Sequence, residues 1–328
     1  MKVLITGANG FVGSAVIRQL LETGHTLRAL VRPGSDRRNL EGLAVELCEG
    51  DLADPDSLAP AVRGCEILFH VAADYRLWIP DPATMYRINV DGTRHLLDQA
   101  FNAGVRRAVY TSSVAALGLS SDGEPANEET PVVPDRIIGH YKRSKYLAEQ
   151  SVLKLVREQS YPVVIVNPST PIGPRDIKPT PTGRIIVDTL NGKMPAYVDT
   201  GLNIVHVDDV ARGHILALEH GEPGERYILG GENMTLKQIL DEICGYAGLK
   251  PPKIKLPHNA IIPIAWIAER ISDITGKEPV ATVDSVRMAK KNMFFSSDRA
   301  REKLGYLPRP ARDGIADAIR WFRENKYC

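Results

Sequence analysis

The sequence is poor in cysteine and lacks the cysteine patterns that hold metals or disulfide frameworks. Only four cysteines occur in 328 residues. None of them forms a CxxC pair or a paired spacing near histidines: Cys48, Cys65, Cys244 and Cys328. Sparse, unpaired cysteines are typical of a reducing compartment. We therefore expect a cytoplasmic protein without a metal site or a disulfide framework.

Charge and hydrophobicity also lack extremes. The 41 basic and 40 acidic residues give no electrostatic basis for binding nucleic acid. The apolar run after Lys2 ends at Gly7, too early for a signal peptide. The most apolar later stretch, residues 260–268 (AIIPIAWIA), is too short to span a bilayer. This stretch has the composition for peripheral membrane contact, but we favour a buried helix.

The chain opens with a strand pattern that runs into three evenly spaced glycines. Residues 2–6 are apolar without alternation, which predicts a strand buried on both faces. A helical pattern follows the glycines. Such a turn lets the backbone approach a pyrophosphate, and the helix start supplies free N–H groups. A purely structural turn is the alternative, and GxxGxxG differs from the dehydrogenase spacing GxGxxG. We favour dinucleotide binding through this loop: Gly7, Asn9, Gly10, Phe11, Val12 and Gly13.

Strand and helix patterns alternate through the first half of the chain. The predicted strands cover residues 2–6, 26–31, 45–50, 66–71, 107–112 and 162–166, and the long helices cover 82–103 and 140–159. This alternation predicts an α/β Rossmann fold with a doubly wound parallel sheet. We assign residues 1–170 and about 203–222 to the dinucleotide-binding domain, which includes a strand–helix pair at 204–219. Residues about 171–202 and 223–328 are assigned to a smaller α/β substrate domain.

The loop after the second predicted strand carries arginine where NAD-binding proteins carry a carboxylate. Arg32 occupies that position and Arg37 follows closely. Guanidinium groups suit the 2′-phosphate of NADP, so we favour NADP(H) over NAD(H), with a solvated basic loop as the alternative. Four residues after the third and fourth strands are expected to face the cofactor: Asp51, Leu52, Ala72 and Ala73.

Three residues suggest alcohol–carbonyl chemistry. Tyr141 and Lys145 are four residues apart on a predicted helix and therefore share a face. An ammonium and a positive nicotinamide ring are expected to lower the pKa of the tyrosine from about 10, so that it acts as acid and base. Ser113 follows the fifth strand, where its hydroxyl can bond the same substrate oxygen.

These motifs together resemble the extended short-chain dehydrogenase/reductase family, also called the NAD-dependent epimerase/dehydratase family. The matching segments are TGANGFVG, GDLADP, HVAA, NVDGT, YTSSV, YKRSK, NPSTPIGPRD and HVDDVA, spread over essentially the whole chain. Within the family, AADYRLW and YILGGENMTL look most like hopanoid-associated sugar epimerases, which are themselves similar to dihydroflavonol 4-reductases.

The resemblance implies roles for individual residues. Tyr141 would be the acid/base, Lys145 would bind the nicotinamide ribose, and Ser113 would polarise the substrate. It also implies cofactor contacts at Asn89, Pro168 and Ser169 and a substrate-side Arg175. Relatives in the family imply a homodimer through helices 82–103 and 139–159.

Several side chains are expected near the substrate. Aromatic and apolar groups suit a ring or a lipid-like ketone, and arginines suit an anionic group; packing and salt bridges are the alternative. The candidates are Tyr75, Trp78, Arg143, Ile172 and Arg184. His206 and Asp208 are expected to be supports at a domain junction, and His140 to belong to the helix start.

More than one function is compatible with these residues. The leading expectation is a hopanoid-associated sugar or nucleotide-sugar epimerase. The alternative is an NADPH-dependent reductase of a ketone or aldehyde, which Arg32 favours. A non-catalytic NADP-binding regulatory module and a structural partner in a lipid-modifying complex are further hypotheses. Val114 follows Ser113 where a dehydratase would carry acidic residues, which argues against elimination chemistry.

Overall fold

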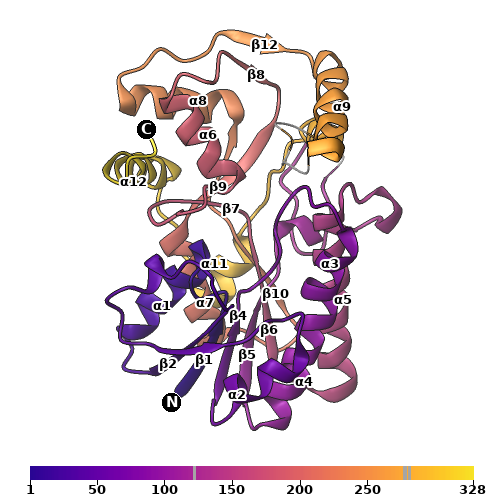
Figure 1. Ribbon diagram of the computed structural model, residues 1–328, viewed down its shortest axis with the longest axis vertical. Coiled ribbons are helices and arrows are strands. Elements are labelled where there is room, and N and C mark those ends of the chain that lie inside the picture. The colour runs from indigo at the N-terminus through magenta and orange to yellow at the C-terminus, as the bar shows by residue number, and fades with distance from the viewer. Residues whose placement is uncertain (121–122, 276–278, 280–281) are drawn as a thin grey trace.

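The computed structural model describes residues 1–120, 123–275, 279 and 282–328. At its centre lies a seven-stranded sheet in the order β10-β6-β5-β4-β1-β2-β3 (Figure 1). Every neighbouring pair in this sheet is parallel. The strands are β1 (Lys2–Thr6), β2 (Thr26–Val31), β3 (Glu46–Glu49), β4 (Ile67–His70), β5 (Arg107–Thr111), β6 (Val163–Pro168) and β10 (Arg226–Leu229). The predicted doubly wound Rossmann sheet is confirmed.

Helices cover both faces of this sheet, because side chains alternate along each strand. Val3 and Ile5 face one core, and Leu4 faces the other. The first core includes α1 (Phe11–Leu21), α7 (Val207–His220) and α11 (Asp298–Leu304). The second includes α2 (Ala59–Val62), α4 (Thr93–Asn102) and α5 (His140–Gln159). The predicted helix over 82–103 is confirmed as α3 (Pro82–Tyr86) and α4, joined by a π-helical segment at Arg87–Gly92.

A smaller α/β part lies beyond one end of the large sheet (Figure 1). Its three-stranded sheet, β11-β9-β7, consists of β7 (Thr170–Ile172), β9 (Gly201–His206) and β11 (Glu232–Thr235). Helices α6 (Pro181–Leu190), α8 (Leu236–Ala247) and α12 (Ala311–Glu324) pack around a separate apolar core. Strands β8 (Ala196–Val198) and β12 (Ile254–Leu256) pair at the periphery, near α9 (His258–Thr275) and α10 (Val283–Met288).

Two strand assignments from the sequence were wrong. The strand at 226–229, assigned to the smaller domain, pairs with β6 as an edge of the large sheet. The strand at 204–207, expected in the large sheet, belongs to β9 of the small one, although its helix α7 does pack on the large sheet. Both strands are apolar runs, and such a run does not specify which sheet buries it.

Residues 260–268 lie in α9, and some of the side chains that we expected to be buried are exposed. Ala265 is buried, but Trp266 and Ile267 are 53% and 54% exposed. The expectation of a buried helix was therefore wrong for these two side chains. Across the described ranges, no helix combines the length and apolarity needed to cross a membrane.

Candidate active site

The glycine turn after β1 has the shape that a pyrophosphate requires. Gly7 has φ +66°, and a Cβ on Gly13 would lie 2.1 Å from the Gly7 carbonyl oxygen. The Gly10 N–H closes the turn onto that same oxygen at 2.9 Å. Gly10 is also the N-cap of α1 and has no side chain to cover the N–H groups of Phe11 and Val12. The turn is thus a cradle of bare backbone at a helix start, which fits a pyrophosphate.

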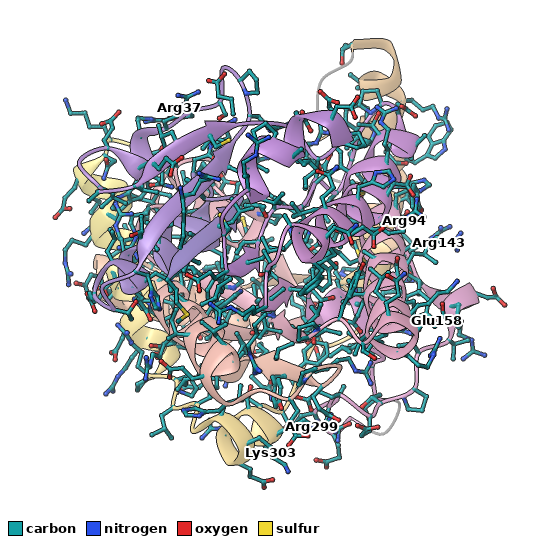
Figure 2. The ribbon with its side chains drawn as sticks, turned by 90° about the horizontal axis from the view of Figure 1, so that it is seen from below. Arg37, Arg94, Arg143, Glu158, Arg299 and Lys303 are labelled. Atoms are coloured by element: carbon teal, nitrogen blue, oxygen red, sulfur yellow. The ribbon has the colours of Figure 1, made fainter. Side chains whose placement is uncertain are left out.

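The loop after β2 is hydrogen-bonded to this turn. Asn9 donates its side-chain amide to the Asp36 carbonyl at 2.8 Å. Arg38 binds the Asp36 carboxylate and lowers its pKa to about 2. Arg37, at the surface in Figure 2, pairs with Glu49. Arg32 is exposed, and no residue in the described part of the chain pairs with its side chain. It therefore differs from Arg37 and Arg38 of this loop, which each pair with a carboxylate.

The loops after β3 and β4 pack closely on their neighbours. The Asp51 carboxylate accepts the Ala53 N–H at 2.9 Å, which fixes the turn that presents Leu52. A Cβ on Gly92 would lie 2.7 Å from the Leu52 carbonyl, so glycine allows the π-helical segment to approach this loop. Ala72 donates its N–H to Thr6 Oγ1 at 3.1 Å beside the glycine turn. Ala73 follows and is partly exposed.

Ser113 and Tyr141 meet at the carboxyl end of β5. Ser113 follows that strand in extended conformation, and its hydroxyl accepts the Ala115 N–H at 3.1 Å. Tyr141, in the first turn of α5, lies close enough to Ser113 for the serine hydroxyl to act on the pKa of its phenol. Burial raises the pKa of Tyr141, and the nearby Ser113 hydroxyl offsets only part of this rise. The phenol of the protein alone therefore keeps its proton at neutral pH, and the lowering of its pKa by Lys145 together with a nicotinamide ring stays a prediction.

Lys145 lies one helical turn after Tyr141 and is buried. Its ammonium donates to the Thr111 carbonyl at 2.8 Å and to the Tyr110 hydroxyl at 3.4 Å. Burial lowers the pKa of Lys145 to about 8, while the carboxylate of Glu149 acts in the opposite direction. The ammonium is thus held against the end of β5 by oxygen atoms of the protein.

Sequence reasoning missed a second layer of polar residues. Glu149 is fully buried and accepts the Asn167 side-chain amide at 2.7 Å. The same amide nitrogen donates to the Ser113 carbonyl at 3.1 Å. The hydroxyls of Ser112 and Ser169 are buried without a hydrogen-bond partner within the described part of the chain. Orphaned polar atoms after β5 and β6 fit the carboxamide of a nicotinamide, and Ser169 lies next to the predicted Pro168.

Asn89 holds protein groups together. It exchanges two hydrogen bonds with the backbone of Asp74, at 2.7 and 2.9 Å, and donates to Ser144 Oγ at 2.9 Å. Its position in a π-helical segment, which is common at functional sites, aligns the loop after β4 with α5. These contacts occupy its side-chain amide with groups of the protein, and the cofactor contact expected for Asn89 stays a prediction.

The predicted substrate residues are distributed over several elements. Tyr75 is 46% exposed and Trp78 is half-buried in the loop between β4 and α3. Arg184 is exposed on α6 and Arg143 on α5. Ile172 is buried in the core of the small sheet, so the expectation that it faces substrate was wrong.

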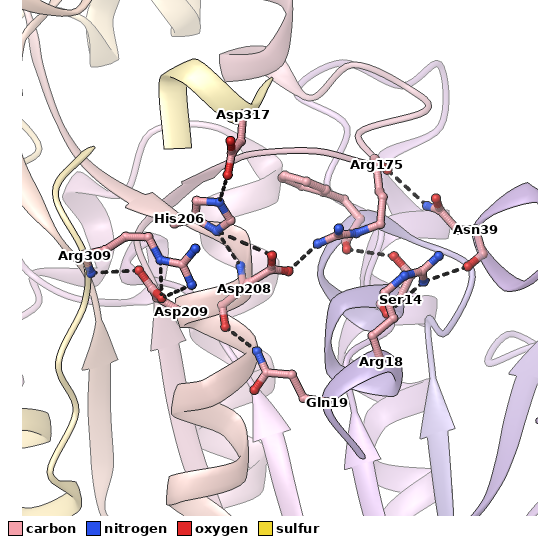
Figure 3. Close-up of polar contacts among 11 residues, drawn as sticks. Ser14, Arg18, Gln19, Asn39, Arg175, His206, Asp208, Asp209, Arg309 and Asp317 are labelled. Atoms are coloured by element: carbon pink, nitrogen blue, oxygen red, sulfur yellow. Dashed lines mark hydrogen bonds and ion pairs between the residues drawn. The ribbon is translucent and has the colours of Figure 1, made fainter. Parts of the chain in front are cut away.

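Arg175 is directed elsewhere than expected. Its guanidinium pairs with Asp208, and its carbonyl accepts from Asn39 at 3.1 Å (Figure 3). Arg18 of α1 donates to the Asn39 carbonyl at 2.9 Å. Arg175 also has φ +76°, a left-handed backbone that the sequence does not reveal. These contacts place it with α1, α7 and the loop after β2, and none of them joins it to Tyr141.

His206 and Asp208 are structural supports, as expected. His206 is fully buried, accepts the Asp208 N–H at 3.0 Å at the start of α7, and lies 3.3 Å from Asp317 of α12 (Figure 3). His140 lies at the start of α5 and contacts the Tyr86 hydroxyl at 3.0 Å.

Known proteins resemble the chain over nearly its full length. The putative dihydroflavonol 4-reductase of Synechocystis is 46% identical over 98% of this chain and 95% of its own. Sterol demethylase protein B of Methylococcus capsulatus is 36% identical over 99% of both chains. The 2-alkyl-3-oxoalkanoate reductase of Shewanella oneidensis is 27% identical over 92% of this chain and 81% of its own.

Solved structures share the fold. The structure of gox2253 has a TM-score of 0.89 and 60% identity, and the match covers 99% of this chain and 98% of that one. A nucleoside-diphosphate-sugar epimerase from Pseudomonas aeruginosa has a TM-score of 0.80 and 27% identity, with coverage of 100% and 99%. The model of the NAD dependent epimerase/dehydratase family matches residues 3–230, which contain the glycine turn, Ser113, Tyr141 and Lys145. The chain is therefore a member of the NAD-dependent epimerase/dehydratase family and an oxidoreductase of the extended short-chain type.

Proposed function

We propose that this protein is an NADP(H)-dependent reductase of a ketone or aldehyde. The observation that carries the proposal is the approach of Tyr141, on α5, to Ser113, just after β5, which brings a proton donor and a second hydroxyl to the same end of that strand. A bound nicotinamide would supply the hydride. Hydroxyls from two elements that meet in this way suit a carbonyl oxygen, which accepts two hydrogen bonds.

Each residue of the trio has a distinct part in this chemistry. Ser113 would hydrogen-bond the carbonyl oxygen and polarise it. Tyr141 would donate its proton as that oxygen becomes an alcohol, and its raised pKa means that the proton is present at neutral pH. Lys145 would stabilise the tyrosinate that remains, since its ammonium lies one turn away.

The names of two relatives support reduction over epimerisation. One is a putative dihydroflavonol 4-reductase and the other a 2-alkyl-3-oxoalkanoate reductase, and both names describe reduction of a carbonyl group.

A preference for NADP(H) is part of the proposal. Arg37 and Arg38 pair with Glu49 and Asp36, so Arg32 is the guanidinium left to bind a ribose 2′-phosphate. Gly7, Gly10 and Gly13 would hold the pyrophosphate, and Ser112 and Ser169 the carboxamide.

A sugar epimerase, including one associated with hopanoids, is the second candidate. The similarity to a nucleoside-diphosphate-sugar epimerase supports it. The pairing of Arg175 with Asp208 weighs against it, because Arg175 was the residue expected on the substrate side.

One experiment distinguishes the two candidates. The purified protein is denatured and any released nucleotide is identified by mass spectrometry, and NADPH consumption is measured with ketones. A site that prefers NADPH and exchanges it freely supports the reductase. NAD that resists dialysis, with no net consumption, supports the epimerase instead.

We also propose a cytoplasmic homodimer through α3, α4 and α5. Leu147 on α5 is 40% exposed, and Arg94 and Arg143 extend outward at the same side of the molecule (Figure 2). Sedimentation at two concentrations tests this, because a monomer at both would contradict it.

A further inference from the structure

Lys142 is a half-buried cation beside the catalytic tyrosine, and it lacks a carboxylate. Its ammonium lies 3.8 Å from the sulfur of Met293, and a thioether is a weak acceptor. Within residues 1–120, 123–275, 279 and 282–328, no acidic side chain forms an ion pair with it. Burial and the nearby Lys291 together lower the pKa of Lys142 to about 8. A half-buried ammonium without a counter-charge loses part of its hydration with nothing to replace it, so its position after Tyr141 requires an explanation.

The surrounding charges do not neutralise it. The first turn of α5 contains no acidic residue, and the N-cap Gly139 provides no side chain. The positive end of the helix dipole therefore adds to the charge of Lys142. Asp284 lies near this turn, with its carboxylate 3.9 Å from the position of a Cβ on Gly139, and it pairs with Arg287 at 3.6 Å. Lys291 is exposed and has no carboxylate partner in the described ranges.

The position of Lys142 links this charge to the reaction. It directly follows Tyr141, whose side chain approaches Ser113. Met293, which the ammonium contacts, packs in the cluster that contains Val114, the residue after Ser113. The ammonium therefore lies by the apolar cluster that contains the residue after Ser113, and α5 itself packs against the turn Val114–Ala116.

We propose that Lys142, assisted by Lys291, binds a carboxylate on the substrate, and that the substrates are 3-oxo acids. The assignment rests on the proposed reductase function, since it places the carboxylate relative to a carbonyl held by Ser113 and Tyr141. A lysine near the start of a helix, with no acidic partner, is unfavourable for helix stability. Residues that are unfavourable for stability are often found at functional sites. A compact ammonium can form a charge-assisted hydrogen bond with one carboxylate.

The test compares acetoacetate with methyl acetoacetate, two ketones that differ in charge at one end. The full-length protein and NADPH are used, and the ratio of the two kcat/KM values is measured. We expect wild type to prefer the acid, Lys142→Met to lower this preference at least ten-fold, and Lys142→Arg to restore part of it. Lys154→Met, an exposed lysine farther along α5, should leave the ratio as in wild type. A wild type without preference for the acid, or a ratio unaffected by Lys142→Met, would overturn the proposal.

Two further measurements separate this proposal from the proposed function. Binding of the two ketones to the NADPH complex of Tyr141→Phe is followed by NADPH fluorescence. If wild type reduces neither ketone, the proposed reductase function fails. The carboxylate site is still supported if the acid binds more tightly than the ester and this difference disappears in a protein that also carries Lys142→Met. Equal binding, or no binding, overturns the carboxylate site. Lys142→Met should also raise the midpoint of thermal unfolding, because it removes an unpaired, half-buried charge. A lower midpoint indicates a purely structural lysine and counts against the site.

Discussion

Asn167 donates its side-chain amide to Glu149 Oε2 at 2.7 Å, and both residues are fully buried. This bond joins the end of β6 to α5 beneath the site. The same amide nitrogen donates to the Ser113 carbonyl, and Glu149 lies one helical turn after Lys145. The carboxylate of Glu149 therefore positions Ser113 through Asn167 and stabilises the protonated form of Lys145.

Glu149→Gln should shift the pH dependence of the reaction. The carboxylate raises the pKa of Lys145, so its removal lowers that pKa below about 8. Lys145 then loses its proton at a lower pH, and kcat should fall several-fold at pH 8 and less at pH 6.5. Glutamine keeps an oxygen for Asn167, so the fold should be retained. Glu158→Gln, an exposed acid on the same helix (Figure 2), is the control. Superimposable pH profiles for wild type and Glu149→Gln would contradict the electrostatic role.

Arg32→Gln should change cofactor choice. Loss of a charge-assisted contact with the 2′-phosphate should raise the KM for NADPH by about 10- to 100-fold and affect NADH little. Steady-state kinetics with each cofactor measures this. Arg312→Gln, a 75% exposed arginine, is the matched control. An equal rise in KM for NADPH and NADH would show that Arg32 does not bind the 2′-phosphate.

Gly13→Ala should destabilise the glycine turn, because its Cβ would lie 2.1 Å from a backbone oxygen of Gly7. We expect a lower unfolding midpoint and loss of cofactor binding. Gly245→Ala in α8 is the matched variant, since its Cβ would meet nothing within 4 Å. This second change should stabilise the protein by about 0.5–1 kcal/mol through helix propensity. Similar midpoints for the two variants would contradict the close approach at Gly13.

Two buried histidines should make the fold less stable in acid. Burial lowers the pKa of His70 to about 3 and that of His214 to about 4. The unfolded chain protonates its histidines near pH 6.5, so stability is complete above that pH. Below it, each buried histidine removes about 1.4 kcal/mol per pH unit until its folded pKa is reached.

Urea unfolding between pH 7 and pH 5 measures this effect. His214→Gln should show a shallower loss of unfolding free energy with falling pH. His220→Gln, an exposed histidine, should keep the slope of wild type. An unchanged slope for His214→Gln would mean that this histidine is protonated in the folded state.

Much of the large sheet could be predicted because its signals are local. Apolar runs separated by turns gave β1 to β6, and helical periodicity gave α5 with its observed ends. The predicted trio of Ser113, Tyr141 and Lys145 is brought together because strand ends and the start of α5 share one edge of the sheet. The strand at 226–229 was misassigned because its pairing with β6 joins segments about 60 residues apart.

The site residues that were missed depend on contacts between distant segments. Glu149 looks like an ordinary helix position, and its burial arises from packing against Asn167 and Arg226. Lys142 belongs to a run of charges that a helix normally exposes to solvent. The direction of Arg175 follows from a left-handed backbone conformation that no local pattern indicates.

In the proposed reaction the phenol of Tyr141 gives a proton to a carbonyl held by Ser113. The direct test is single-turnover reduction of acetoacetate and methyl acetoacetate by the NADPH-loaded protein, wild type against Tyr141→Phe, with Tyr246→Phe at an exposed tyrosine as the control. We expect a rate about 10²- to 10⁴-fold lower in Tyr141→Phe with NADPH affinity unchanged. A Tyr141→Phe protein that reduces either ketone at the wild-type rate would contradict it.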